Sequence, residues 1–331
     1  MTPLVLGLDI GGANLKAATV DKRAVSVPFA LWKQPDKLPA ALADLVGQFP
    51  DAEELAVTMT GELCDCYETK REGVNAILDA VEFAAKGRQV RVWSTDGAFV
   101  GVEESRSDYM KVAAANWHAL ATFAGRYARK GGALLIDIGS TTTDIIPILD
   151  GRPISTGKTD VERLRSGELV YTGVGRTPVC ALLGKSVAAE VFATTRDAYL
   201  ILEWQSERPE DLDTADGRTA TLKNASARMS RMLCGDPETI SADEIRRLAE
   251  RVLAVQREIV EEAAVRVAGL VPGRVRVAIT CGRGEPVATA VLGCPMFDGL
   301  ERLSLNDILG PTVSACAPAY ALAVLATERR P

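Results

Sequence analysis

The feature that most constrains this chain is a short pattern that occurs twice. In each copy an apolar strand ends at an aspartate, a glycine-rich turn follows, and a second apolar strand leaves the turn. The copies span residues 4–18, around Asp9, and residues 134–148, around Asp137. The two aspartates lie about 130 residues apart in a chain of 331 residues. Such a duplication predicts two related α/β units that face each other across a cleft.

Both turns have the composition of a phosphate site, because backbone N–H groups and hydroxyls gather in a concavity that suits phosphate oxygens. The candidate phosphate-binding residues are Gly11, Gly12, Asn14 and Lys16 in the first turn, and Gly139, Ser140, Thr141, Thr142, Thr143 and Asp144 in the second. Mg²⁺ prefers one or two carboxylates together with phosphates and water, so we expect Asp9 and Asp137 to be its ligands. The alternative is a pair of structural hairpins, with Lys16 facing solvent.

Further polar residues fall near the turns. Glu62 follows the apolar run 54–59 and is expected at the cleft, or alternatively in the first turn of a helix capped by Thr60. Residues 163–176 contain three arginines and Glu168. We expect Arg163 and Arg176 to bind a diphosphate or a carboxylate, because a guanidinium pairs with two oxygens at once. The alternative is a solvated face with weak ion pairs.

The remaining pattern is that of alternating helices and strands. We expect helices over residues 38–49, 69–85, 110–129, 243–267 and 315–327, a helix or connector over 195–204, strands over 54–59, 90–94, 186–194 and 275–280, and an inserted loop at about 206–224. The spacing of Ser241 and Glu244 predicts a capping box at the start of the helix over 243–267. The first domain would comprise residues 1–131 plus about 312–331, and the second residues 132–311. Asn116 and Trp117 lie in the helix expected over 110–129 and either pack in the core or face the cleft.

Composition excludes several classes of function. The net charge of −6 and the lack of a basic stripe argue against binding nucleic acid. No apolar run is long enough to span a membrane, and the chain enters a strand without a signal sequence, so we expect a cytoplasmic protein. Seven scattered cysteines indicate reduced thiols. His118 is the only histidine, which disfavours a Ser-His-Asp or Cys-His mechanism.

The two turns resemble the phosphate-1 and phosphate-2 loops of the actin/hsp70/sugar-kinase superfamily. The stretch ITCGRGEPVA resembles its adenosine loop, with Gly282 and Gly284 separated by an arginine. More narrowly, the chain resembles the hydantoinase/oxoprolinase-like proteins of methanofuran biosynthesis and bacterial relatives linked to tetrahydromethanopterin-dependent C1 transfer. Four stretches carry this resemblance: DIGGANLKAA, AAANWHALATF, DIGSTTTDIIPI and RLRSGELVYTGVGRTPVCALL. This resemblance implies duplicated ribonuclease-H-like domains, with mixed sheets flanked by helices and a cleft between them.

The resemblance also implies a transferase that condenses a furanylmethyl diphosphate with a phenol, either γ-glutamyltyramine or a tyrosine-like compound, and releases diphosphate. Asp9 and Asp137 would act through Mg²⁺ on the leaving group, and Glu62 or Glu168 would be the base. Asn116 and Trp117 would hold a furan or phenol ring if they face the cleft. Such chemistry requires neither a histidine nor a cysteine nucleophile.

Two other functions fit the same motifs. In an ATP-dependent kinase or ATPase the turns would hold ATP, and Gly282 and Gly284 would contact the adenosine. The motifs alone favour this alternative, but the adenosine loop departs from the usual pattern and we identify no catalytic aspartate between the loops. A non-catalytic scaffold ranks last, because Asp9, Asp137 and Asp144 are all retained. The absence of metal-binding histidines disfavours ATP-independent hydantoin hydrolysis.

Overall fold

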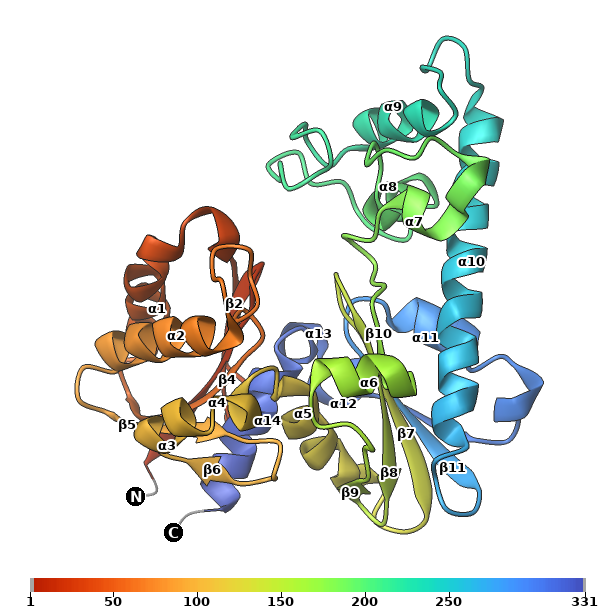
Figure 1. The fold of residues 1–331 in the computed structure, drawn as a ribbon. Helices are drawn as coiled ribbons and strands as arrows, with labels where there is room; N and C mark the ends of the chain where they lie inside the picture. Colours follow the sequence, from red (N-terminus) through yellow and green to blue (C-terminus); the bar gives the residue numbers. More distant parts are fainter. Residues whose placement is uncertain (1–2, 330–331) are drawn as a thin grey trace.

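The computed structural model describes residues 3–329 and contains two mixed β-sheets flanked by helices (Figure 1). The first sheet has the order β3-β2-β1-β4-β5-β6, with β1 (Leu4–Ile10), β2 (Asn14–Thr19), β3 (Ala24–Pro28), β4 (Ala52–Met59), β5 (Gln89–Trp93) and β6 (Phe99–Val100). The second has the order β10-β8-β7-β11-β12 with β9 paired to β8, and consists of β7 (Gly132–Ile138), β8 (Thr143–Leu149), β9 (Arg152–Pro153), β10 (Leu169–Val170), β11 (Val275–Cys281) and β12 (Glu301–Ser304).

The central strands of the two sheets are paired in the same way. β1 pairs antiparallel with β2 and parallel with β4. β7 likewise pairs antiparallel with β8 and parallel with β11. The repeated strand–Asp–turn–strand motif therefore occupies equivalent places in two related sheets, which confirms the expected duplicated fold.

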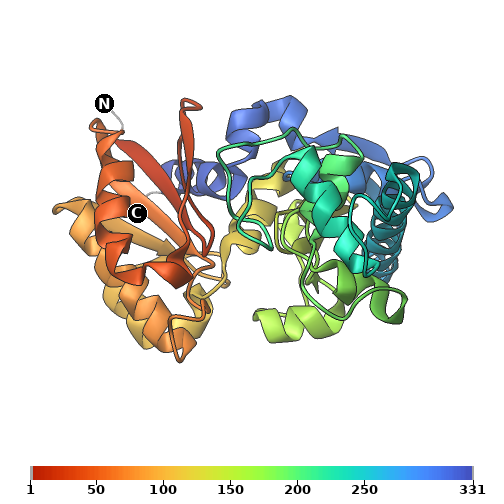
Figure 2. The ribbon, with the colours of Figure 1, turned by 90° about the horizontal axis from the view of Figure 1, so that it is seen from above.

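Three layers of helices cover the sheets. Helices α1 (Leu38–Gly47) and α2 (Lys70–Ala85) pack on one face of the first sheet. Helices α5 (Asn116–Ala124) and α14 (Ala317–Glu328) share one apolar core with residues of both sheets, so they lie between them (Figure 1). On the far face of the second sheet lie α10 (Ala242–Ala268) and α11 (Glu285–Val291). Seen from above, the two halves lie side by side (Figure 2).

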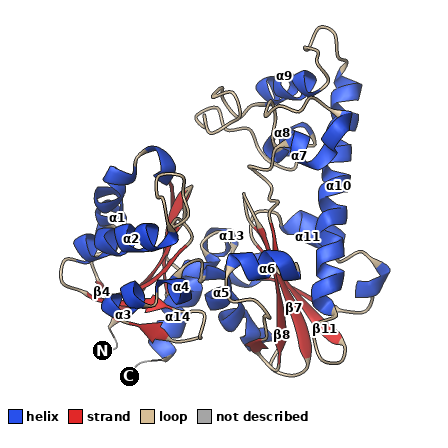
Figure 3. Ribbon diagram, viewed as in Figure 1, coloured by secondary structure: helices blue, strands red, loops and turns tan. Residues whose placement is uncertain are grey.

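A helical unit projects beyond the second sheet. It is formed by α7 (Val179–Leu183), α8 (Thr195–Ile201), α9 (Leu222–Met232) and the first part of α10, and it has its own apolar core. Figure 3 shows helices and loops in this unit, with the strands confined to the sheets below. The Ser241–Glu244 capping box expected at the start of α10 is present. The segment expected as an inserted loop is irregular up to Thr221, and α9 begins at Leu222.

The remaining α-helices of the described chain are short: α3 (Val102–Ser107), α4 (Tyr109–Val112), α6 (Asp160–Ser166), α12 (Leu305–Leu309) and α13 (Pro311–Ser314). No helix between residues 3 and 329 is long and apolar enough to cross a membrane.

The prediction of a single helix over residues 110–129 is wrong. The chain forms α4, breaks, and resumes as α5, with Ala114 at a φ of +50° in the break. The carbonyl of Lys111 accepts a hydrogen bond from the Thr95 amide at 2.8 Å instead of continuing the helix. The alanine-rich sequence favoured a helix through this point, and a tertiary contact overrides that local preference.

The strand expected over residues 186–194 is also wrong. This segment is irregular, apart from a single bridge between Thr194 and Pro178. Its apolar residues Val187, Phe192 and Ala193 instead pack against the core of the helical unit. An apolar run that fills a helical core has the same composition as a buried strand, so periodicity alone does not separate them.

Candidate functional site

The two glycine-rich turns have the same backbone geometry. The amide of Gly11 donates to the carbonyl of Asn14 at 3.0 Å, and the amide of Gly139 donates to the carbonyl of Thr142 at 2.9 Å. Cross-strand partners also correspond, because the aspartate next to the end of each first strand faces the residue seven positions later on the second strand. The two turns are therefore copies of one structure, although their side chains differ.

In the first copy the facing residues carry opposite charges. Asp9 lies opposite Lys16, and the Lys16 Nζ is 3.5 Å from an Asp9 carboxylate oxygen. Burial raises the pKa of Asp9, and Lys16 only partly offsets that effect. Burial lowers the pKa of Lys16, but the charges of Asp9 and Asp137 raise it by more, so the net shift is upward. Lys16 thus stays a cation that pairs with Asp9 and is also attracted by the charge of Asp137.

In the second copy the facing residues are both acidic. Asp137 lies opposite Asp144, and burial together with the Asp144 charge raises the pKa of Asp137 to about 7. Burial also raises the pKa of Asp144, against the lowering effect of Arg163. Two partly buried carboxylates that face each other favour a bound cation, because each disfavours ionisation of the other.

Arg163 neutralises Asp144 from the side of α6. Its Nη2 lies 2.6 Å from an Asp144 carboxylate oxygen, and its side chain is almost fully buried. The guanidinium also lies over the ring of Trp117, 4.1 Å from the ring centroid. Trp117 is buried in the core between the sheets, which favours the packing alternative for this residue. Asn116 is partly exposed at the start of α5.

Residues 173–176 hold the second turn in place. The amides of Gly175 and Arg176 both donate to the carbonyl of Ser140 at 2.9 Å. A Cβ at Gly173 would lie 2.6 Å from backbone atoms of Gly139, Ser140 and Thr141, so only glycine permits this approach. The Thr143 hydroxyl is buried and donates to the Thr172 carbonyl at 2.8 Å, so it supports the turn.

Arg176 connects the second turn with the first half of the molecule. Its guanidinium lies 4.3 Å from the ring centroid of Trp32 in η1 (Leu31–Lys33). The amide of Leu31 donates to the carbonyl of Gly12 at 2.9 Å, so η1 is bound to the first turn. Arg176 therefore reaches across from one turn to the support of the other.

The loop after β4 lies beside the first turn, because the amides of Thr60 and Gly61 donate to the carbonyl of Ile10. No helix starts at Thr60; the helix that follows, α2, is capped by Thr69. Glu62 is buried, and burial raises its pKa. The Lys70 Nζ lies 3.4 Å from one carboxylate oxygen of Glu62, whereas the other oxygen has no hydrogen-bond partner within residues 3–329.

Lys70 also pairs with Asp160 of α6, at 3.1 Å, so the polar group around Glu62 joins the two halves. Sequence reasoning did not select Lys70, Asp160 or Trp32. The position of α6 was detectable, because Thr159 and Glu162 form a capping box with the spacing that such boxes require. Nothing local marks Lys70 or Trp32, whose importance comes from contacts with distant segments.

Glu168 lies in a different environment. It is fully buried, and its carboxylate accepts hydrogen bonds from the amides of Thr156 and Gly157, at 2.8 and 3.1 Å, and from the hydroxyl of Ser166 at 3.0 Å. Both carboxylate oxygens are thus engaged by the protein. These contacts give Glu168 a role in holding the loop before α6.

The glycines of the third motif pack against the second turn. A Cβ at Gly282, where φ is +86°, would lie 2.3 Å from a carboxylate oxygen of Asp137. The amide of Gly284 donates to the carbonyl of Ile138 at 2.9 Å. Gly282 also borders a cavity of about 580 Å³ that Asn306 and Ser314 help to line. The adenosine-like loop is therefore adjacent to the aspartate of the second turn.

Asp9 and Asp137 suit an Mg²⁺ ion whose other ligands are the oxygens of a bound phosphate compound and water. Within residues 3–329 no group of three or more histidine, cysteine, aspartate or glutamate side chains could hold a metal by itself. One buried carboxylate oxygen of Asp9 has no hydrogen-bond partner in the same range. One or two carboxylates completed by phosphate oxygens and water are the usual environment of Mg²⁺.

Comparisons with known proteins agree with this fold and place the chain in a family. The chain is 35% identical, over 98% of both chains, to (4-{4-[2-(gamma-L-glutamylamino)ethyl]phenoxymethyl}furan-2-yl)methanamine synthase of Methanocaldococcus jannaschii. It is 35% identical to the protein of that name from Methanococcus vannielii, over 58% of this chain and 89% of the relative. Among solved structures, nucleotide-free acetone carboxylase superposes with a TM-score of 0.57 at 12% identity, covering 98% of this chain and 70% of that one. The hydantoinase/oxoprolinase family model matches residues 53–329, and the chain belongs to that family.

Proposed function

We propose that the protein is a transferase that joins a phenol oxygen to a furanylmethyl group, with diphosphate as the leaving group. The observation that carries this proposal is the pair of equivalent turns, in which Lys16 pairs with the buried Asp9 and is also attracted by the charge of Asp137. Two such turns can hold the two phosphates of one diphosphate. The name of the archaeal relatives describes a phenoxymethyl-furan ether, which is the bond this reaction would form.

The chemistry assigns a role to each polar group. The C–O bond between the furanylmethyl carbon and the diphosphate breaks, and its electron pair leaves with the diphosphate. Lys16 and the amides of the two turns stabilise that developing charge. Asp9 and Asp137 would hold Mg²⁺, which supplies further charge stabilisation when bound. The phenol oxygen then forms the new C–O bond and gives up its proton.

Glu62 is the best candidate to receive that proton. It is buried beside the first turn, its pKa is raised, and one of its oxygens has no partner between residues 3 and 329. A base with a raised pKa is better matched to a phenol than an ordinary carboxylate is. Glu168 is less suited, because backbone amides already occupy both of its oxygens.

The test is diphosphate release from a furanylmethyl diphosphate in the presence of Mg²⁺ and either tyramine, tyrosine or γ-glutamyltyramine. We expect release that depends on the phenol and an ether product of the corresponding mass. ATP hydrolysis without phenol-dependent release would contradict the proposal and favour an ATP-dependent kinase or ATPase. Binding of neither diphosphate nor ATP would favour a scaffold.

A further inference from the structure

Next to the second turn lies a cavity of about 260 Å³ that the proposed reaction does not use. Ser140 and Gly175, at the second turn, line this cavity, and Arg283 of the adenosine-like loop lines it as well. The helical unit supplies Arg196 and Arg208. Three arginines from separate segments therefore meet beside the turn, in a protein whose net charge is −6.

Two of these arginines have no partner among the described residues. Arg196 forms an ion pair with Asp211 at 2.8 Å, whereas no ion pair or hydrogen bond of the Arg208 or Arg283 guanidinium exists within residues 3–329. Burial lowers the pKa of Arg283, and the charges of Arg208 and Arg196 lower it further. The cavity thus holds more positive charge than the protein neutralises, together with one carboxylate, that of Asp211.

The wall that carries these groups is structured. The amide of Arg208 donates to the carbonyl of Ala220 at 2.8 Å, and the amide of Ala220 donates to that of Asp211 at 2.9 Å. Gln205 donates to the carbonyl of Val174 at 3.0 Å and so attaches this wall to the segment that supports the second turn.

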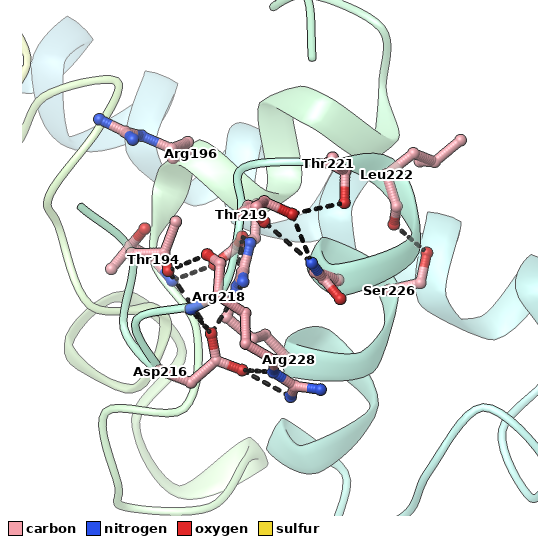
Figure 4. Close-up of polar contacts among 12 residues, drawn as sticks. Thr194, Arg196, Asp216, Arg218, Thr219, Thr221, Leu222, Ser226 and Arg228 are labelled. Carbon is pink, nitrogen blue, oxygen red and sulfur yellow. Dashed lines mark hydrogen bonds and ion pairs between the residues drawn. The ribbon is translucent and has the colours of Figure 1, made fainter. Parts of the chain in front are cut away.

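Ion pairs of the buried Arg228 hold the loop that contains Arg208 and Asp211. Arg228 pairs with Asp197 at 2.7 Å and with Asp216 at 2.9 Å. Figure 4 shows this network around Asp216 and Arg228, and it shows Arg196 directed away from it. Asp211 and Asp216 of the loop are thus engaged by arginines, and Arg196, the partner of Asp211, lines the cavity.

We propose that this cavity binds the α-amino-acid head group of the phenolic substrate, with its carboxylate on Arg208 and Arg283 and its ammonium directed toward Asp211. The inference rests on the proposed function, which supplies an acceptor with a glutamyl or tyrosine-like end. A guanidinium pair suits a carboxylate because each can donate two parallel hydrogen bonds. The volume lies below the range of about 300–1,000 Å³ typical of pockets for whole drug-sized ligands, so it suits a head group better than a complete nucleotide.

Calorimetric titration with two pairs of ligands tests the inference without turnover. Tyrosine is compared with tyramine, and γ-glutamyltyramine with N-butyryltyramine, which has the same chain without the amino and carboxylate groups. We expect the wild-type protein to bind the carboxylated member of at least one pair about 10-fold or more tightly, as expected for a charged hydrogen bond. The double variant Arg208→Gln/Arg283→Gln should lose this preference and still bind inorganic diphosphate.

The matched control is Arg257→Gln, an exposed arginine of α10 with the same change in charge. Its ligand preference should equal that of the wild type. A preference that survives in the double variant, or one that is absent from the wild type, would overturn the inference. So would a double variant that loses affinity for ATP and keeps its preference for the carboxylated ligand.

Failure of the site and failure of the reaction are separable. If the carboxylate preference is lost in the double variant but no diphosphate is released from the furan substrate, the head-group site stands and the proposed reaction falls. If diphosphate is released and neither ligand pair is discriminated, the reaction stands and the site falls.

Discussion

Asp137 lies directly opposite Asp144 on the β7–β8 hairpin, in the register position where the β1–β2 hairpin places Asp9 opposite Lys16. The duplicated hairpin has therefore diverged in charge at one position. The first copy contains its own cation. The second copy brings two carboxylates together, of which Asp144 pairs with Arg163 of α6 and Asp137 has no ion pair within residues 3–329, so a bound cation would stabilise it. This asymmetry gives the site a direction, with an ammonium on one side and paired carboxylates on the other.

The raised pKa of Asp137 predicts a dependence of stability on pH. Folded Asp137 has a pKa of about 7, against 3.8 for the unperturbed group, so the folded state binds a proton that the unfolded state releases between these values. Its contribution to stability is fully present below about pH 4 and is lost as the pH rises through 7, at most about 4 kcal/mol. Urea unfolding between pH 4.5 and 8 should show a smaller decline for Asp137→Asn than for the wild type. An exposed control, Asp36→Asn, should follow the wild type, and equal slopes in all three proteins would contradict the assignment.

Lys16 is predicted to bind the leaving group. Replacing Lys16 with alanine removes the one side-chain cation that pairs with Asp9 within residues 3–329, so affinity for inorganic diphosphate should fall about 10-fold or more. Calorimetric titration in the presence of Mg²⁺ measures the effect. Lys37→Ala, on the exposed side of η2 (Pro35–Lys37), removes the same charge away from the turns and should bind normally. Unchanged affinity in Lys16→Ala would contradict phosphate binding by Lys16 and favour the alternative that its side chain faces solvent.

Gly173 tests whether the second turn must keep its shape. In Gly173→Ala the new Cβ would meet backbone atoms of Gly139, Ser140 and Thr141 at 2.6 Å. We expect a loss of about 1–3 kcal/mol in the free energy of unfolding, together with weaker diphosphate binding. Gly47→Ala is the matched control, because nothing lies within 4 Å of a Cβ there and the site is helical, so its stability should equal or exceed that of the wild type. A variant at Gly173 that binds diphosphate normally would show that the turn tolerates displacement.

Glu62 is predicted to act as the base. Glu62→Gln should reduce phenol-dependent diphosphate release about 100-fold or more and leave diphosphate affinity unchanged. The rate should rise with pH as Glu62 loses its proton. In Lys70→Met the rising limb should move to higher pH, because Lys70 lowers the pKa that burial raises. A pH profile that does not move in Lys70→Met would argue against Glu62.

The sequence predicted the elements that depend on local pattern. Both hairpins, the capping box at Ser241 and the long helix after it follow from periodicity and turn chemistry, and the structure contains them. The errors at Ala114 and at residues 186–194 arose where a distant segment changed the backbone or where apolar residues filled a helical core. The same reason explains the polar residues that were missed. Lys70, Trp32 and Arg208 become relevant only when segments far apart in the chain meet, and no spacing in one sequence records such a meeting.

The placement of α14 has a consequence for synthesis on the ribosome. This helix is buried on nearly all sides and packs on β1, β2 and β4, although more than 250 residues separate it from those strands. Synthesis adds about 5–20 residues per second, so many seconds pass between the emergence of the first strands and that of the helix that packs on them. The second sheet completes the core on its far face, against α10 and α11, from contiguous chain before α14 emerges. We therefore expect nascent chains stalled before residue 317 to protect β7, β8 and β11 from proteolysis and to leave β1 accessible until the last helix is released.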